Sequence, residues 1–159
     1  MTLREAGSAC LAYFYCDFRD EEKQNCRHLV LSILSQLAAQ SDLCCDILSS
    51  LHLAHDGGGR KPNGGALIQC LKEMLLLPTH TPVYLIIDAL DECSNNSGLP
   101  TAREEVLSLV QDLVDLHPPN VHLCVTSHPE IDIRTALESL TSLCISLHNQ
   151  SGQTKGITD

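Results

Sequence analysis

The chain has 159 residues, of which 43% are hydrophobic and 19% charged, a balance that fits one globular domain and excludes a disordered chain. Its formal net charge is -10 and its one basic cluster is Arg60 with Lys61, so a nucleic acid is not an expected partner. No apolar run approaches the roughly 20 residues that span a bilayer, and no apolar signal segment follows Met1, so we expect no membrane partner and a cytoplasmic protein.

The first third of the chain predicts one strand and two helices. Residues 10–18 are rich in β-forming side chains, which indicates a strand whose end reaches the surface. A helix capped by Asp20 should follow, and a second helix should span about 42–54. The first helix has apolar residues at helical spacing, namely Leu29, Val30, Ile33, Leu34 and Leu37.

A loop, a helix and a buried strand are predicted next. Glycine and proline interrupt all periodicity over 56–65, as in a flexible loop. Helical spacing resumes at Ala66 and stops at Pro78. The run VYLIID at 83–88 is apolar, short and bounded by turn signals, which is typical of a fully buried parallel strand.

The remaining elements continue the alternation of helices and strands. Thr101 and Glu104 form the capping box of a helix, and VHLCVTS at 121–127 predicts a second buried strand. A helix should start at Pro129, and a last short strand should lie at about 143–147. Strands that alternate with helices predict a parallel sheet with right-handed crossovers, in which ligands sit beyond the carboxyl ends of the strands.

Cysteine and histidine spacing does not indicate a metal site. The nine cysteines include no C-x-x-C pair, and most lie in apolar stretches, so we expect free thiols instead of a disulfide framework or a zinc site. His52 and His55 have a spacing that can chelate a metal on a helix, but no third ligand is placed to complete a site. We interpret them as helix-surface residues.

Three carboxylates stand at the end of the buried strand 83–88. Asp88 ends the apolar run and is a candidate ligand for Mg²⁺, because a strand fixes its position and the metal offsets its charge. Asp91 and Glu92 follow closely and are candidates for orienting or deprotonating an attacking water. The alternative is that Asp91 and Glu92 only cap the turn that follows.

Polar residues also end the strand 121–127. The hydroxyl groups of Thr126 and Ser127 would reach the same pocket if this strand lies beside the Asp88 strand, and there they would sense a terminal phosphate or hold the attacking water. The alternative is that Ser127 or His128 caps the helix starting at Pro129.

The segments YLIIDALDEC and LCVTSHPEIDIR, with the opening LAYFYCDFRDEEKQNCRHLVLSILSQL, together resemble the NACHT domain of STAND-type P-loop NTPases. The resemblance is greatest to the fungal group of nephrocystin 3-like N-terminal domains and covers nearly the whole chain. It implies a partial NACHT domain over 1–148 followed by a polar C-terminal tail at 149–159. The implied fold is a three-layer P-loop NTPase-like α/β domain, a parallel sheet with helices on both faces.

The resemblance also assigns roles to the candidate residues. It makes Asp88 the Walker B magnesium ligand and Asp91 with Glu92 the acidic group that positions the hydrolytic water. Thr126 and Ser127 match the sensor strand. Where the family usually has Ser-Arg-Pro, this chain has His128 in place of the arginine, a side chain that is shorter and mostly neutral at pH 7.

The family's phosphate-binding loop, G-x-x-x-x-G-K followed by Ser or Thr, does not occur in these residues. The resemblance places that loop one helix before the LAYFY strand and implies a sheet order of 5-1-4-3-2, so we expect the first strand and the phosphate loop to be missing. The sensor strand would then have an uncovered flank, unless the last strand lies beside it. We expect a marginal, association-prone domain.

The resemblance implies Mg²⁺ with ATP or GTP as cofactors and a role in signalling. Without the phosphate loop, we expect no hydrolysis by this chain alone. One alternative is a nucleotide-independent interaction module or decoy that pairs through its open sheet edge with a full-length NACHT relative or with itself. Another is an inactive, truncated gene product.

Overall fold

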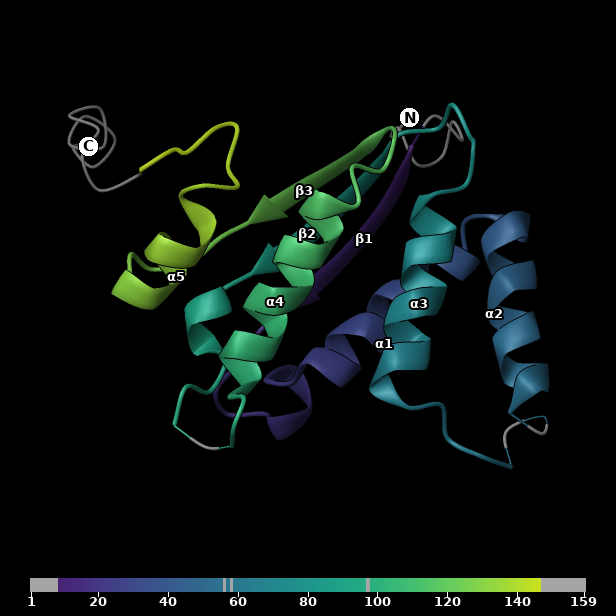
Figure 1. Cartoon of the computed structure of the whole chain (residues 1–159), viewed down its shortest axis with the longest axis horizontal. Coiled ribbons are helices and arrows are strands. Elements are labelled where there is room, and N and C mark those ends of the chain that lie inside the picture. Colours follow the sequence, from purple (N-terminus) through teal and green to yellow (C-terminus); the bar gives the residue numbers. More distant parts are fainter. Residues whose placement is uncertain (1–8, 56, 58, 97, 147–159) are drawn as a thin grey trace, which may run out of the picture.

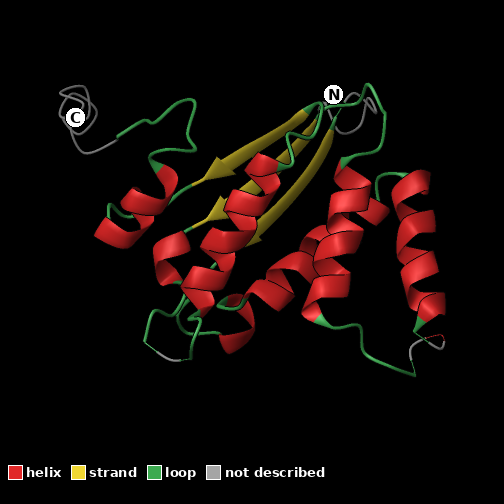
Figure 2. Cartoon of the chain, viewed as in Figure 1, coloured by secondary structure: helices red, strands yellow, loops and turns green. Residues whose placement is uncertain are grey.

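A computed structural model of the chain describes residues 9–146 except positions 56, 58 and 97. Within these residues the protein has an α/β fold with one three-stranded parallel sheet and five α-helices (Figures 1 and 2). The strands are β1 (Cys10–Tyr15), β2 (Val83–Asp88) and β3 (Val121–Val125). The helices are α1 (Cys26–Ala38), α2 (Asp42–Ala54), α3 (Gly64–Leu75), α4 (Ala102–Asp115) and α5 (Ile131–Leu137), with 3-10 turns η1 (Glu21–Lys23) and η3 (Leu90–Glu92).

The helices α1 and α3 begin at residues other than those predicted. α1 starts after Asn25, whose side chain accepts a hydrogen bond from His28 N. The predicted cap, Asp20, instead accepts from Glu22 N and so holds the short η1 turn that precedes the helix. α3 starts two residues early, because Asn63 caps it through Ala66 N.

The sheet has the order β1-β2-β3, and all neighbouring strands are parallel. One face forms the core, with Ala12, Phe14, Leu85 and Ile87 buried. α1 packs on this face at β1, α4 lies over the same side, and α2 and α3 pack beside α1 (Figure 1). The buried residues of β1, β2 and the helices belong to one hydrophobic cluster, and the partly buried Val121, Leu123 and Val125 of β3 pack against it.

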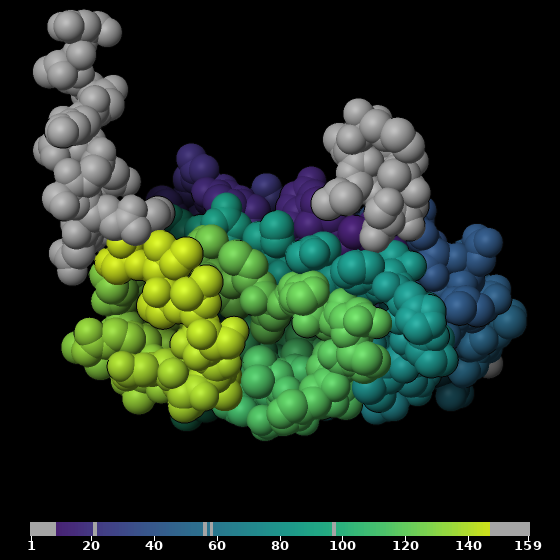
Figure 3. Space-filling view, turned by 90° about the horizontal axis from the view of Figure 1, so that it is seen from above, coloured from purple at the N-terminus to yellow at the C-terminus, as the bar shows by residue number. Residues whose placement is uncertain are grey.

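The prediction of helices on both faces of the sheet is wrong for the described residues. No described helix covers the opposite face, and in the view of Figure 3 β1 lies at the side away from α4 and α5. The strand order explains this, because a right-handed crossover between successive neighbouring strands always places its helices on the same side. The side chains of this face include Leu11, Tyr13, Tyr15, Tyr84, Ile86, His122 and Cys124.

The predicted strand at about 143–147 is not found. Residues 143–146 have no strand structure, and residue 147, like the tail 149–159, lies outside the described residues. Leu143 and Ile145 are exposed by 75% and 64%. Their short alternating pattern has no neighbouring strand to satisfy its backbone groups, and a strand is not stable without one.

The two edges of the sheet differ. At β1, the side-chain amides of Gln36 and Gln40 each accept a hydrogen bond from a backbone N–H and donate one to the C=O of the same residue. Gln36 bonds to Tyr13 and Gln40 to Leu11, at 2.8 to 3.1 Å. At β3, no hydrogen bond between described residues satisfies the outward backbone groups of the alternate residues Val121, Leu123 and Val125. The β1 edge is therefore closed by side chains, and the β3 edge is open as far as the described residues show.

Candidate functional site

Asp88 and Thr126 meet at the carboxyl edge of the sheet. Asp88 is the last residue of β2, and its carboxylate accepts a hydrogen bond from the hydroxyl of Thr126, just after β3. The same hydroxyl accepts from the N–H of Ala89 at 3.0 Å. Ala89 has a φ of 55°, in the left-handed region, so the chain turns sharply after Asp88. The condition set in the sequence analysis is met for Thr126: β3 lies beside β2, and the hydroxyl of Thr126 reaches Asp88.

Main-chain bonds continue past the ends of the strands. The N–H of Leu90 donates to the C=O of Thr126 at 2.9 Å, and the N–H of Cys16 donates to the C=O of Asp88 at 3.0 Å. The loops after all three strands are thus joined to one another. Successive side chains of a strand point to opposite faces. Asp88 is four residues after Tyr84 and Thr126 is two residues after Cys124, so their side chains lie on the same side as these two residues, at the margin of the uncovered face.

Asp91 and Glu92 lie in the η3 turn and bond to the loops of the neighbouring strands. The carboxylate of Asp91 accepts from the N–H of His128 at 2.8 Å. The carboxylate of Glu92 accepts from the N–H of Phe18 at 3.2 Å. One acid therefore positions the loop after β3, and the other positions the loop after β1.

Ser127 and His128 are both exposed, and neither caps α5. That helix begins at Ile131, two residues later than predicted, with Glu130 at its N-cap position. Pro129 thus lies in the loop before the helix. The alternative in which Ser127 or His128 caps the helix is excluded.

Asp17, which follows β1, is paired within its own loop. Its carboxylate accepts hydrogen bonds from the side chain and the main chain of Arg19, which lower the pKa of Asp17 to about 2. The distances are 2.9 to 3.0 Å. This acid is therefore engaged by a cation two residues away.

Arg103 is a central residue of the site that the sequence analysis missed. It is buried, and its guanidinium donates to the C=O of Asp91 at 2.6 Å and to the C=O of Cys93 at 3.2 Å. It also pairs with Glu130 and Asp132. Burial opposes the charge, but the hydrogen bonds to these carboxylates raise the pKa of Arg103. Its helical spacing to Val106 and Val110, both buried, was the available signal.

A pair of thiols lies beside the acidic loop and was also missed. The sulfur atoms of Cys16 and Cys93 are 3.1 Å apart, and both residues are buried. Their shared hydrogen bond raises the pKa of the Cys16 thiol, as burial also does, and lowers the pKa of the Cys93 thiol. The residues are 77 positions apart, so spacing in the sequence gives no sign of this contact.

Any Mg²⁺ bound at this edge would be held by a single protein carboxylate, that of Asp88. Among the described residues, no three His, Cys, Asp or Glu side chains cluster so that they alone would hold a metal. Mg²⁺ needs no such cluster, since it commonly binds one or two carboxylates and completes its shell with water and substrate phosphates. Asp88 has hard oxygen atoms and a fixed position at a strand end, so it fits that role.

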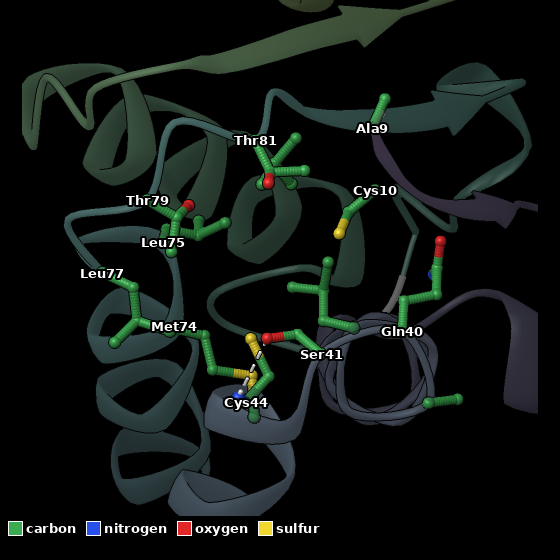
Figure 4. Close-up of a pocket in the computed structure, with 13 residues that line it drawn as sticks. Ala9, Cys10, Gln40, Ser41, Cys44, Met74, Leu75, Leu77, Thr79 and Thr81 are labelled. Carbon is green, nitrogen blue, oxygen red and sulfur yellow. Dashed lines mark hydrogen bonds between the residues drawn. The ribbon is translucent and has the colours of Figure 1, made fainter. Parts of the chain in front are cut away.

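Two cavities lie away from the acidic loop. One, of about 350 Å³, is at the amino ends of β1 and β2, where Cys10, Cys44 and Met74 are among its lining residues (Figure 4). Another, of about 640 Å³, lies between α1, α3 and α4.

No described helix is both long and apolar enough to cross a bilayer.

The parallel sheet, with its acidic and hydroxyl side chains at the carboxyl edge, defines a protein of the parallel α/β class. The family described as Nephrocystin 3, N-terminal matches residues 1–128. The chain therefore belongs to the nephrocystin 3 N-terminal family. No curated protein matches the chain. No solved structure matches it either.

Proposed function

We propose that the chain is the magnesium-binding and sensor half of a NACHT-type nucleotide-binding domain from a cytoplasmic signalling NTPase. The observation that supports this most is the hydrogen bond between Asp88 and Thr126. It joins the tip of the central strand to the start of the next loop, where a ligand would contact both. The family match over 1–128 is consistent with this function.

In this proposal Asp88 is the magnesium ligand, through one carboxylate oxygen and the metal's water shell. The metal would offset the charge of the phosphates of ATP or GTP. Thr126, Ser127 and His128 would lie near the terminal phosphate. The exposed side chains of Ser127 and His128 support this, because they are accessible at the same edge.

Asp91 and Glu92 would orient the attacking water, but each already accepts a main-chain hydrogen bond. The 159 residues contain no G-x-x-x-x-G-K motif to enclose phosphates. Both facts support a chain that does not hydrolyse nucleotide by itself. Its part in catalysis would require phosphate-binding groups from elsewhere.

The magnesium site can be tested with Mn²⁺, a paramagnetic substitute, on the isotope-labelled chain. Amide signals near Asp88 should broaden first in the parent chain and in Asp46→Ala, which alters an exposed acid on α2. Asp88→Ala should lose the broadening. If Asp88→Ala keeps it, or if the parent shows none around Asp88, the metal assignment is wrong.

Hydrolysis is tested separately by phosphate release from ATP and GTP with Mg²⁺. The parent chain should not exceed a protein-free blank. Turnover that disappears in Asp88→Ala would contradict the proposal that this chain alone is inactive, while leaving Asp88 as the metal ligand.

A second candidate function is a nucleotide-independent interaction module. It is favoured by the open β3 edge and by the uncovered face beside it, on which Tyr13 is exposed by 58% and Tyr84 by 39%. The partner would be a second copy or a full-length NACHT relative whose strand pairs with β3. An inactive product remains the third alternative and predicts neither metal binding nor association.

Pairing at β3 has a direct readout in amide hydrogen exchange. The N–H groups of Val121, Leu123 and Val125 should become protected as concentration rises or as an intact relative is added, while those of Leu11 and Tyr13 should not change. Light scattering should show the matching change in mass. A monomer at every concentration, with no capture of the relative, would rule this function out.

A further inference from the structure

The sulfur atoms of Cys16 and Cys93 are the only pair of thiols joined by a hydrogen bond among the nine cysteines, all of which are described. Cys16 directly follows β1, and Cys93 directly follows the η3 turn that contains Asp91 and Glu92. The exposed fraction is 0% for Cys16 and 1% for Cys93. The contact thus lies inside the molecule, between two segments that border the candidate site.

We propose that Cys16 and Cys93 are a reversible disulfide-forming pair, oxidised by a small hydroperoxide, which covalently joins the end of β1 to the acidic loop after β2. This inference does not rest on nucleotide binding. It uses the proximity of the sulfur atoms, which must approach by about 1 Å to reach bonding distance.

The chemistry balances with hydrogen peroxide as the oxidant. The Cys93 sulfur attacks one peroxide oxygen, the O–O bond breaks, and the products are a Cys93 sulfenic acid and water. The Cys16 sulfur then attacks the sulfenic sulfur, and a second water leaves with the Cys16 proton. Two thiols and one peroxide give one disulfide and two waters.

The surroundings favour Cys93 as the first to react. The hydrogen bond with Cys16 and the charge of Arg103 both lower the pKa of the Cys93 thiol, against its burial and the charge of Asp91. Burial of both residues excludes bulky reagents, so the oxidant must be small. A second thiol at 3.1 Å captures the sulfenic acid before it is oxidised further.

The bond would change the mobility of the candidate site. Asp91 and Glu92 directly precede Cys93, and the N–H of Cys16 already donates to the C=O of Asp88. A disulfide here would prevent the acidic loop from separating from β1. Reduction would restore only the hydrogen-bonded connections.

The test uses the full chain with Cys45, Cys124 and Cys144 changed to serine, because these three exposed thiols would otherwise cross-link chains. After peroxide treatment and blocking of free thiols, peptide mapping without reductant should recover Cys16 joined to Cys93 in a monomeric chain. The midpoint of thermal unfolding should rise on oxidation and return with dithiothreitol.

Two single changes in this background serve as a comparison. Cys93→Ala should abolish both the cross-linked peptide and the rise in midpoint, whereas Cys70→Ala, which removes another buried thiol, should leave both. If Cys93→Ala does not fold, the peptide map of the background chain decides alone. Recovery of Cys16 and Cys93 as separate blocked thiols, as sulfinic acids, or joined to other cysteines would overturn the proposal.

Discussion

The guanidinium Nη2 of Arg103 donates a 2.6 Å hydrogen bond to the main-chain oxygen of Asp91, a residue of the acidic loop. The same guanidinium group pairs through Nη1 with Glu130 and Asp132, which flank the start of α5. One buried cation on α4 therefore connects the loop after β2 to the segment after β3. The position of the acidic loop depends on this side chain as well as on the sheet.

Arg103→Met should destabilise the protein. The apolar side chain keeps part of the packing but leaves the C=O groups of Asp91 and Cys93 without this donor, at a cost of about 1 to 3 kcal/mol in the free energy of unfolding. We do not expect more, because Glu130 and Asp132 remain about half exposed and are hydrated. Urea denaturation measures the change. The exposed Arg134→Met is the control, and an equal loss there would contradict the role of Arg103.

Thr126→Val should lower stability by about 1 kcal/mol, because it removes the hydroxyl that bonds Asp88 and Ala89 while keeping the shape of the side chain. Thr126→Ser keeps the hydroxyl and should retain most of the stability. The amide signal of Ala89 should move in the valine variant and stay near its position in the serine variant. Equal shifts in both variants would show that the hydroxyl is not the cause.

The pairing of Asp17 with Arg19 gives a pH dependence. Because the pKa of Asp17 is about 2 in the folded chain and about 4 in an unfolded one, the pairing stabilises the fold above the unfolded value. That contribution is lost as the pH falls from about 4 towards 2. A carboxyl NMR titration should show the low pKa, and Arg19→Gln should return it towards the ordinary range. A low pKa that persists in Arg19→Gln would assign the effect to another group.

The glutamine pair on α1 should protect the β1 edge. Changing both Gln36 and Gln40 to alanine removes the bonds to Tyr13 and Leu11 and should speed hydrogen exchange of those two amides, with a loss of about 1 to 3 kcal/mol in stability. Gln69→Ala, which alters an exposed glutamine on α3, is the matched control. Unchanged exchange in the double variant would mean that the edge is protected in another way.

Helices and strands were predicted correctly where residues within the element itself determine its bounds. The apolar run at 83–88 and the helix at 42–54 were predicted with their observed bounds, and the capping box of Thr101 and Glu104 is present. The start of α1 was not, because Asn25 and Asp20 are both competent caps and only the intervening 3-10 turn distinguishes them. The strand expected at 143–147 failed because strand formation needs a partner that a short pattern cannot reveal.

Some residues of the candidate site could be predicted from the sequence, and others could not. Asp88 and Thr126 were found because each stands at the end of an apolar run that predicts a strand, and the alternation of elements implied that the strands are parallel. Arg103 and the thiol pair were missed because their partners are distant in sequence: Cys16 and Cys93 are separated by 77 positions. The alternation of strands and helices also did not predict that all the described helices lie on one face of the sheet, because this depends on the spatial order of the strands.

The unequal edges of the sheet limit how copies of this protein can associate. An edge closed by Gln36 and Gln40 cannot take a further strand without breaking four hydrogen bonds, whereas the β3 edge has nothing to break among the described residues. Edge-to-edge growth into a fibre requires two receptive edges per molecule. With one, two copies can meet only β3 to β3 about a two-fold axis, and the assembly then terminates as a closed pair.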